Sequence, residues 1–119
     1  MNKQVIHADA LEWLNNNELK GASIITSLPD ISEFPKFTMQ EWKSWFIETA
    51  KLVMTKCSPE GIAIFYQSDI KRDGVWIDKS FLLQQAANQL HQTLVAHKIV
   101  CRAPAGINTQ TKTGYSHLL

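Results

Sequence analysis

Apolar runs alternate with helical patterns along this chain, and the alternation predicts a single α/β domain over residues 1–119. Four runs have the length and the β-branched content of strands, at 4–8, 22–28, 62–66 and 95–101. A fifth run at 114–119 is expected to pair back on the fourth as an antiparallel hairpin. The strand–helix–strand rhythm of the first half is typical of a parallel sheet, so we expect mostly parallel strands with helices on both faces.

Capping residues mark where the helices begin. Asp9 with Glu12, and Thr38 with Glu41, have the spacing of a capping box. The first pair opens a short helix, and the second opens a long helix with one apolar face. This face is formed by Trp42, Trp45, Phe46, Thr49, Leu52 and Val53. Its two tryptophans could stack on bases, but they fall in phase with the aliphatic residues, which favours core packing. A further helix is expected from residue 77 or 78 to 91.

Two of the predicted strands stop in polar turns. The turn after strand 22–28 consists of Ser27, Leu28, Pro29 and Asp30, and the turn after strand 62–66 consists of Gln67, Ser68 and Asp69. A proline has no N–H to give to a sheet, so the first strand must end near Leu28. Ligands of open α/β sheets bind at the carboxyl ends of strands, which makes both turns candidate sites. The alternative is that they end strands and carry no chemistry.

Composition sets the broad class of the protein. Of the 119 residues, 45% are hydrophobic and 19% are charged, which is typical of a soluble globular domain. The net charge of +1 gives no strong electrostatic signal for nucleic acid, although a local basic patch is compatible with it. No apolar run has the length of a membrane span and no signal peptide is evident, so we expect a cytoplasmic protein without membrane contact. The two cysteines and four histidines show no metal-type spacing, and no metal site is expected.

Several polar residues outside the two turns have two interpretations each. Residues 70–75 read as a charged surface loop, either solvated or in contact with an anionic substrate. Lys79 stands at a helix start and could meet an anion there, but solvation is favoured. Tyr115 and His117 alternate on the last strand, which places them on one face.

The runs 5–14 and 24–30 resemble the opening of amino-methyltransferases that use S-adenosylmethionine, in the circularly permuted order that places the catalytic half first. Those proteins read as strand, Gly-Asp, short helix and strand. A tetrapeptide follows, made of Asp, Asn or Ser, then Pro-Pro and an aromatic residue. The resemblance covers nearly the whole chain. It implies a partial Rossmann-like methyltransferase sheet and methyl transfer from S-adenosylmethionine to an amine, with RNA or DNA as the expected substrate.

The resemblance assigns roles to the two turns. An amine that attacks a sulfonium methyl group needs its lone pair localised on nitrogen, and two hydrogen-bond acceptors favour this. The Ser27 hydroxyl and the Leu28 carbonyl would be these acceptors. Leu28 replaces the first proline of the tetrapeptide, Pro29 matches the second, and Asp30 stands where the base-stacking aromatic is found, which puts base stacking and a DNA target in doubt.

Further roles follow by the same resemblance. Asp9 would contact the adenosyl part of the cofactor, and its role as a helix N-cap is compatible with that contact. The substrate-binding residues would be Gln67, Ser68 and Asp69, lining the acceptor pocket.

The cofactor half of such an enzyme is not recognisable in this sequence. The family holds the methionine part of its cofactor with a glycine-rich turn, because only glycine allows such close backbone approach. The chain has five glycines, at 21, 61, 74, 106 and 114, and no two are close enough to form that turn. We therefore expect the chain to be the N-terminal catalytic half of a longer methyltransferase domain, or a fragment of one.

A missing half would leave strand 22–28 as an unpaired apolar edge. The chain is then expected to self-associate, to rearrange its first strand, or to be unstable alone.

Two other classes of function remain open. A non-catalytic module could keep the scaffold and bind nucleic acid through Lys71, Arg72, Lys98, Arg102 and Lys112. An α/β domain with another small-molecule task is the third possibility, because fold does not fix function.

Overall fold

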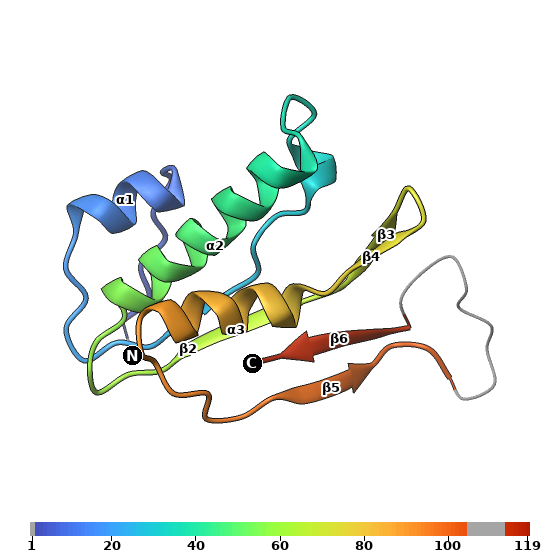
Figure 1. Ribbon diagram of the computed structural model, residues 1–119. Helices are drawn as coiled ribbons and strands as arrows, with labels where there is room; N and C mark the ends of the chain where they lie inside the picture. Colours follow the sequence, from blue (N-terminus) through green and yellow to red (C-terminus); the bar gives the residue numbers. More distant parts are fainter. Residues whose placement is uncertain (1, 105–113) are drawn as a thin grey trace.

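The computed structural model describes residues 2–104 and 114–119. It contains a mixed sheet with the strand order β1-β2-β6-β5 and a separate two-stranded hairpin, β3-β4 (Figure 1). Residues 105–113, which include Lys112, lie outside the described residues.

The four-stranded sheet combines one parallel and two antiparallel pairs. Strand β1 (Ile24–Thr26) runs parallel to β2 (Ala63–Gln67), and β2 pairs antiparallel with β6 (Tyr115–Leu118). Strand β6 also pairs antiparallel with β5 (Lys98–Cys101), which confirms the predicted C-terminal hairpin. The expectation of mostly parallel strands is wrong for the described residues, because only β1 and β2 pair in that sense.

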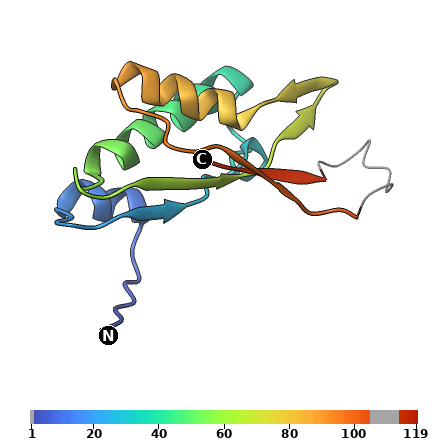
Figure 2. The same ribbon diagram turned by 90° about the horizontal axis from the view of Figure 1, so that it is seen from below.

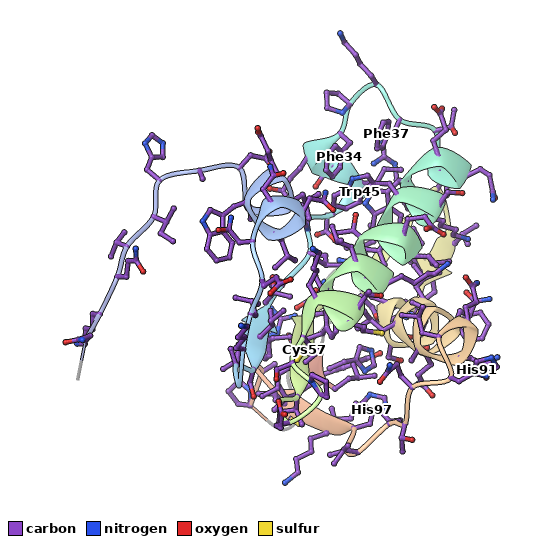
Figure 3. All side chains as sticks on the ribbon, turned by 90° about the vertical axis from the view of Figure 1, so that its left-hand side faces the viewer. Phe34, Phe37, Trp45, Cys57, His91 and His97 are labelled. Atoms are coloured by element: carbon purple, nitrogen blue, oxygen red, sulfur yellow. The ribbon has the colours of Figure 1, made fainter. Side chains whose placement is uncertain are left out.

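All three described α-helices cover the same face of this sheet (Figures 1 and 3). They are α1 (Ala10–Asn16), α2 (Met39–Lys56) and α3 (Lys79–Gln89). On β1, Ile24 packs against the core under the helices, whereas Ile25 is 75% exposed. The prediction of helices on both faces is therefore wrong for this part of the chain.

The helix starts follow the predicted capping residues. The Asp9 carboxylate accepts hydrogen bonds from the N–H groups of Leu11 and Glu12, and so caps α1. Thr38 and Glu41 exchange side-chain to backbone hydrogen bonds of 3.1 and 3.2 Å at the start of α2. These contacts confirm both caps.

The core lies between α2, α3 and the sheet. Trp42 and Phe46 are fully buried, and their rings pack against each other. Trp45 packs on Phe34, which stacks on Phe37 in the segment before α2 (Figure 3). Core packing of the tryptophans is thus confirmed. Cys57 lies just after α2, and both cysteines are free thiols.

The predicted first strand at 4–8 is wrong. Residues 2–8 have no strand assignment, Val5 is 97% exposed, and the segment points away from the sheet (Figure 2). An apolar run becomes a strand only where a neighbour pairs with its backbone groups, and no described strand lies beside this segment.

The predicted charged loop at 70–75 is instead part of a β-hairpin. Strand β3 (Ile70–Arg72) and strand β4 (Val75–Ile77) pair antiparallel across Asp73 and Gly74. Both turn residues have positive φ, 50° and 77°, which is typical of Asp-Gly hairpin turns. The Asp-Gly pair was the available signal for a hairpin. None of the described helices is long and apolar enough to cross a membrane.

Candidate functional site

A cavity of about 360 Å³ opens where β1 and β2 end. We call it the acceptor cavity, and its lining residues are Ser27, Leu28, Pro29, Asp30, Glu33, Tyr66, Gln67, Ser68 and Lys79. Because β1 and β2 are parallel neighbours, their polar turns meet at the same edge of the sheet. The structure thus brings six predicted site residues together. It adds Glu33 and Tyr66, which the sequence did not assign to a site, and Lys79, for which solvation was favoured over contact with an anion.

The loop after β1 is fixed by one amide side chain. Gln67 is 1% exposed, and its Oε1 accepts a hydrogen bond of 2.5 Å from the Leu28 N–H. Its Nε2 donates to the Leu28 carbonyl at 3.1 Å. The Trp42 indole N–H donates to the Pro29 carbonyl at 3.2 Å, so α2 holds the same loop from the core. A carbonyl oxygen has two lone pairs, which leaves the Leu28 oxygen with capacity for a second donor.

Ser27 is the exposed member of this loop. Among the described residues, no group forms a hydrogen bond with its hydroxyl. The loop therefore presents a rigid backbone with one polar side chain that is available to a ligand.

Lys79 is a buried cation in the cavity wall. Its side chain is 2% exposed and forms an ion pair with Asp30, whose side chain is 33% exposed. Burial lowers the pKa of the Lys79 ammonium to about 8. As the first residue of α3, Lys79 also lies where the helix dipole disfavours a positive charge. The favoured prediction of a solvated Lys79 is wrong, because Asp30 from the distant β1 turn covers it.

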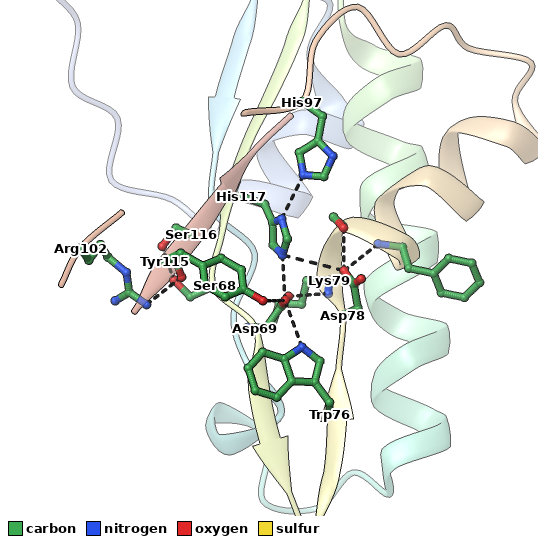
Figure 4. A network of polar contacts seen from close by, with 12 residues as sticks. Ser68, Asp69, Trp76, Asp78, Lys79, His97, Arg102, Tyr115, Ser116 and His117 are labelled. Carbon is green, nitrogen blue, oxygen red and sulfur yellow. Dashed lines mark hydrogen bonds and ion pairs between the residues drawn. The ribbon is translucent and has the colours of Figure 1, made fainter. Parts of the chain in front are cut away.

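A second polar cluster lies on the other side of β2, and we call it the Asp69 network (Figure 4). Asp69 is 3% exposed and accepts hydrogen bonds from donors on several described elements. They include His117 Nε2 at 2.7 Å, the Lys79 N–H at 2.9 Å, Trp76 Nε1 at 3.2 Å and the Tyr115 hydroxyl at 3.3 Å. His97 extends the network through a 3.0 Å contact with His117. The placement of Tyr115 and His117 on one face is confirmed by their shared partner.

The network joins the β3-β4 hairpin, β6 and the start of α3. Burial raises the pKa of the Asp78 carboxyl, but hydrogen bonds from the Ser80 hydroxyl and the Phe81 N–H lower it by more. Asp69, Asp78 and His117 each place one potential ligand atom within 4.8 Å of the others, as metal ligands do. Asp69 Oδ2 already accepts hydrogen bonds from other side chains of the protein. We therefore interpret this cluster as a structural network.

Asp69 therefore does not line the acceptor cavity. Its carboxylate holds the first N–H of α3 and so fixes the position at which Lys79 enters the cavity wall. Ser68 lines the cavity, and its hydroxyl lies 2.6 Å from that of Ser116. Asp9 is exposed at the start of α1 and is not among the cavity residues.

Comparisons with known proteins identify the fold. No protein-family profile matches the chain, and no curated protein matches it. A solved structure does match, "PvuII DNA methyltransferase (cytosine-N4-specific)", with a TM-score of 0.68 and 18% sequence identity. The alignment covers 93% of this chain and 45% of that protein, so the chain spans less than half its length. At this identity the match shows a shared fold alone, consistent with a partial Rossmann-like fold.

The sequence resemblance calls for a glycine-rich turn that holds the methionine part of S-adenosylmethionine, and the glycines at 21, 61 and 74 have other roles. The described glycines at 21 and 74 adopt positive φ in turns. Gly61 is required for packing, because a Cβ there would lie 2.2 Å from the Ala22 carbonyl oxygen. None of these forms a backbone cradle for the methionine part of the cofactor.

Proposed function

We propose that this chain is the acceptor-binding part of an S-adenosylmethionine-dependent amino-methyltransferase that acts on an amino group of RNA or DNA. The observation that carries the proposal is the acceptor cavity. It combines the open Ser27 hydroxyl with a Leu28 carbonyl whose position is fixed by Gln67. The structural likeness to a DNA methyltransferase supports the same conclusion at the level of fold.

These two groups suit an amino substrate. An NH2 group has two hydrogens, and it can donate one to the Ser27 hydroxyl oxygen and the other to the Leu28 carbonyl. Both acceptors hold the nitrogen in place and favour a localised lone pair. Because Gln67 fixes the loop before a substrate arrives, little reorganisation is needed on binding.

This chain has Asp30 where the tetrapeptide of the family has its base-stacking aromatic residue, so another ring would have to stack on the base. Asp30 is engaged by Lys79 and offers no ring. Tyr66 is 37% exposed and lines the same cavity, so its ring is the aromatic surface available to a base. Stacking on an aromatic ring contributes about 1–3 kcal/mol per base in nucleic-acid complexes.

Methyl transfer from labelled S-adenosylmethionine tests the proposal. The protein is purified natively from its source cells with any subunit that stays bound, and is then supplied with labelled cofactor and RNA or DNA. We expect label in the nucleic acid, and a reduction of about 100-fold or more for Ser27→Ala, as for the loss of one preorganised hydrogen-bonding group.

Ser32→Ala is the matched control, because Ser32 is also exposed but does not line the cavity. Equal transfer by the Ser27→Ala and wild-type proteins would contradict the assigned role of Ser27. Absence of transfer to every nucleic acid would contradict the enzymatic proposal itself.

A non-catalytic nucleic-acid-binding module is the second candidate. The ion pair between Asp30 and Lys79 favours it, because the position of the base-stacking aromatic then holds a carboxylate that already has a partner. Lys71, Arg72 and Lys98 are exposed on β3 and β5, where they can contact phosphates. This candidate predicts RNA binding that weakens steeply with salt, with no methyl transfer.

A further inference from the structure

A second cavity, of about 370 Å³, is lined by residues of α2, β4 and α3, and we call it the hairpin cavity. Its lining includes Gln40 and Lys43 of α2, Trp76 of β4, and Phe81 and Gln85 of α3. None of the residues that line it lines the acceptor cavity. Its volume lies within the range of ligand sites, which begins at about 300 Å³, so the hairpin cavity is a separate candidate site.

Trp76 presents an exposed aromatic ring in the wall of this cavity. It is 48% exposed, whereas Trp42 is fully buried in the core. Its Nε1 donates to Asp69 at 3.2 Å, and its ring stacks beside that of Tyr115 with 6.5 Å between the ring centroids (Figure 4). Phe81, which is 59% exposed, adds a second ring to the same cavity. The indole is thus fixed at its polar edge while much of its apolar surface faces solvent, and exposed apolar groups that gather around a cavity mark binding sites.

Cationic and amide side chains surround the two rings. Lys71 is exposed and is the direct cross-strand partner of Trp76, so both side chains project from the same face of the hairpin. Lys43 lines the cavity from α2, and Gln40 and Gln85 add amide groups that can both donate and accept hydrogen bonds. Aromatic rings among cations are typical of sites for single-stranded nucleic acid, where the rings stack on bases and the cations contact phosphates.

The acidic residue of the cavity lining is Asp78, and its carboxylate has a structural role. Its Oδ1 accepts hydrogen bonds from the Ser80 hydroxyl at 2.6 Å and from the Phe81 N–H at 3.1 Å, as the N-cap of α3. The next residue, Lys79, lines the acceptor cavity. The two cavities therefore adjoin at the start of α3, where one nucleic-acid strand can reach both.

We propose that the hairpin cavity is a stacking site for a base of single-stranded RNA or DNA, with Trp76 as the ring on which the base lies. Lys43 and Lys71 contact the neighbouring phosphates. The site binds the flat face of a base and needs no amino group, so it accepts bases that cannot be methyl acceptors. The inference goes beyond the proposed function for this reason, because it adds a second contact with nucleic acid at a different cavity.

Oligothymidylate tests this site separately from the acceptor cavity, because thymine has no exocyclic amino group. Binding of a labelled oligothymidylate of about eight nucleotides to the full chain is measured by fluorescence anisotropy. Trp76→Leu and Trp76→Phe both remove the hydrogen bond to Asp69, and they differ in the aromatic ring. We expect Trp76→Leu to bind about tenfold more weakly than the wild-type chain, as for the loss of stacking on one base, and Trp76→Phe to stay within about threefold.

Tryptophan emission gives a second measurement that needs no variant. The other three tryptophans are buried or half-buried, so stacking of a base on Trp76 should quench the emission of the wild-type chain. Val95→Ala is the control for the binding measurement, because Val95 is 80% exposed but does not line the hairpin cavity. It should bind oligothymidylate as the wild-type chain does.

The outcomes separate this inference from the proposed function. Binding that depends on the Trp76 ring, with no methyl transfer to any nucleic acid, supports the hairpin site and contradicts the proposed function. Equal binding by Trp76→Leu, Trp76→Phe and the wild-type chain overturns the hairpin site and leaves the proposed function unaffected. Equal binding of oligothymidylate and an abasic strand of the same length also overturns it, since phosphate contacts would then suffice. If Trp76→Leu instead releases a bound protein subunit and binds oligothymidylate normally, the ring belongs to a protein interface and the inference is wrong.

Discussion

The acceptor cavity and the Asp69 network both lie at the carboxyl end of β2, but they use their polar groups differently. In the Asp69 network, one buried carboxylate collects donors from β4, β6 and α3. In the acceptor cavity, the Ser27 hydroxyl has no partner among the described residues, and the Lys79 ammonium is paired with Asp30. The two clusters therefore differ: the polar groups of the Asp69 network are paired with one another, whereas the acceptor cavity leaves the Ser27 hydroxyl exposed.

Gln67 and Lys79 connect the two clusters. Gln67 pairs with His117 across the β2–β6 ladder and binds the Leu28 backbone with its side chain. Lys79 gives its N–H to Asp69 and its ammonium to Asp30. The Asp69 network thus acts as a rigid support of the acceptor cavity, because Gln67 and Lys79 each contact residues of both.

The largest expected effect on stability comes from Gln67→Leu. The substitution removes both hydrogen bonds to Leu28, which is 7% exposed, and leaves a buried N–H and a buried carbonyl without these partners. We expect the free energy of unfolding to fall by about 3 kcal/mol, measured by urea denaturation.

Gln84→Leu on the exposed side of α3 is the control, and its effect should stay within about 0.5 kcal/mol. If both variants change the free energy of unfolding by similar amounts, the Leu28 loop does not depend on the Gln67 amide. The idea that the Asp69 network supports the acceptor cavity would then be refuted.

The sequence singled out the two polar turns that the structure brings together, but not the contacts that hold them. Ser27 and Gln67 were predicted to be site residues because polar turns at the ends of parallel strands converge. The hydrogen bonds of Gln67 to Leu28 were not predictable, since an amide at a strand end carries no mark of its partner. Asp69 was assigned to the same pocket, but the β3-β4 hairpin that follows brings Trp76 to its carboxylate.

An intermediate effect is expected for His117→Leu. His117 is 5% exposed, and the change removes its contacts with Asp69 and His97 from the Asp69 network. We expect a loss of about 2 kcal/mol in the free energy of unfolding, because buried partners lose a hydrogen bond.

His97→Leu and His7→Leu are the controls, and both are expected to have smaller effects than His117→Leu. His97 is exposed and contacts the network through His117, so it should cost less; His7, in the exposed N-terminal segment, should have no measurable effect. If His117→Leu is as mild as His7→Leu, the second cluster is not a structural network, and its Asp69, Asp78 and His117 groups would need another explanation.

The fold was predicted best where local signals agreed with long-range pairing. The caps at Asp9 and Thr38 depend on neighbours in sequence, and both were confirmed. The segment at 4–8 has the pattern of a strand, but pairing depends on a neighbour that the pattern cannot supply. The burial of Lys79 was missed for the same reason, because its partner Asp30 comes from a different part of the chain.

The smallest expected effect is a pH dependence that originates at Lys79. Its pKa is about 8 in the folded protein against 10.5 ordinarily, so the unfolded chain binds more protons between these values. Raising the pH in this range therefore favours the folded state. Relative to Lys79→Met, the wild-type chain should gain on the order of 1 kcal/mol between about pH 7.5 and about pH 9.5 in urea denaturation.

Burial raises the pKa of Tyr115, but both proteins contain this residue, so its contribution cancels in the comparison with Lys79→Met. Lys20→Met, compared with the wild-type chain in the same way, should show no such gain. If the gain is absent, the Lys79 ammonium is better hydrated than its burial indicates. Water would then satisfy the N–H groups of the ammonium that do not contact Asp30. The difference between the acceptor cavity and the Asp69 network would rest on the Ser27 hydroxyl alone.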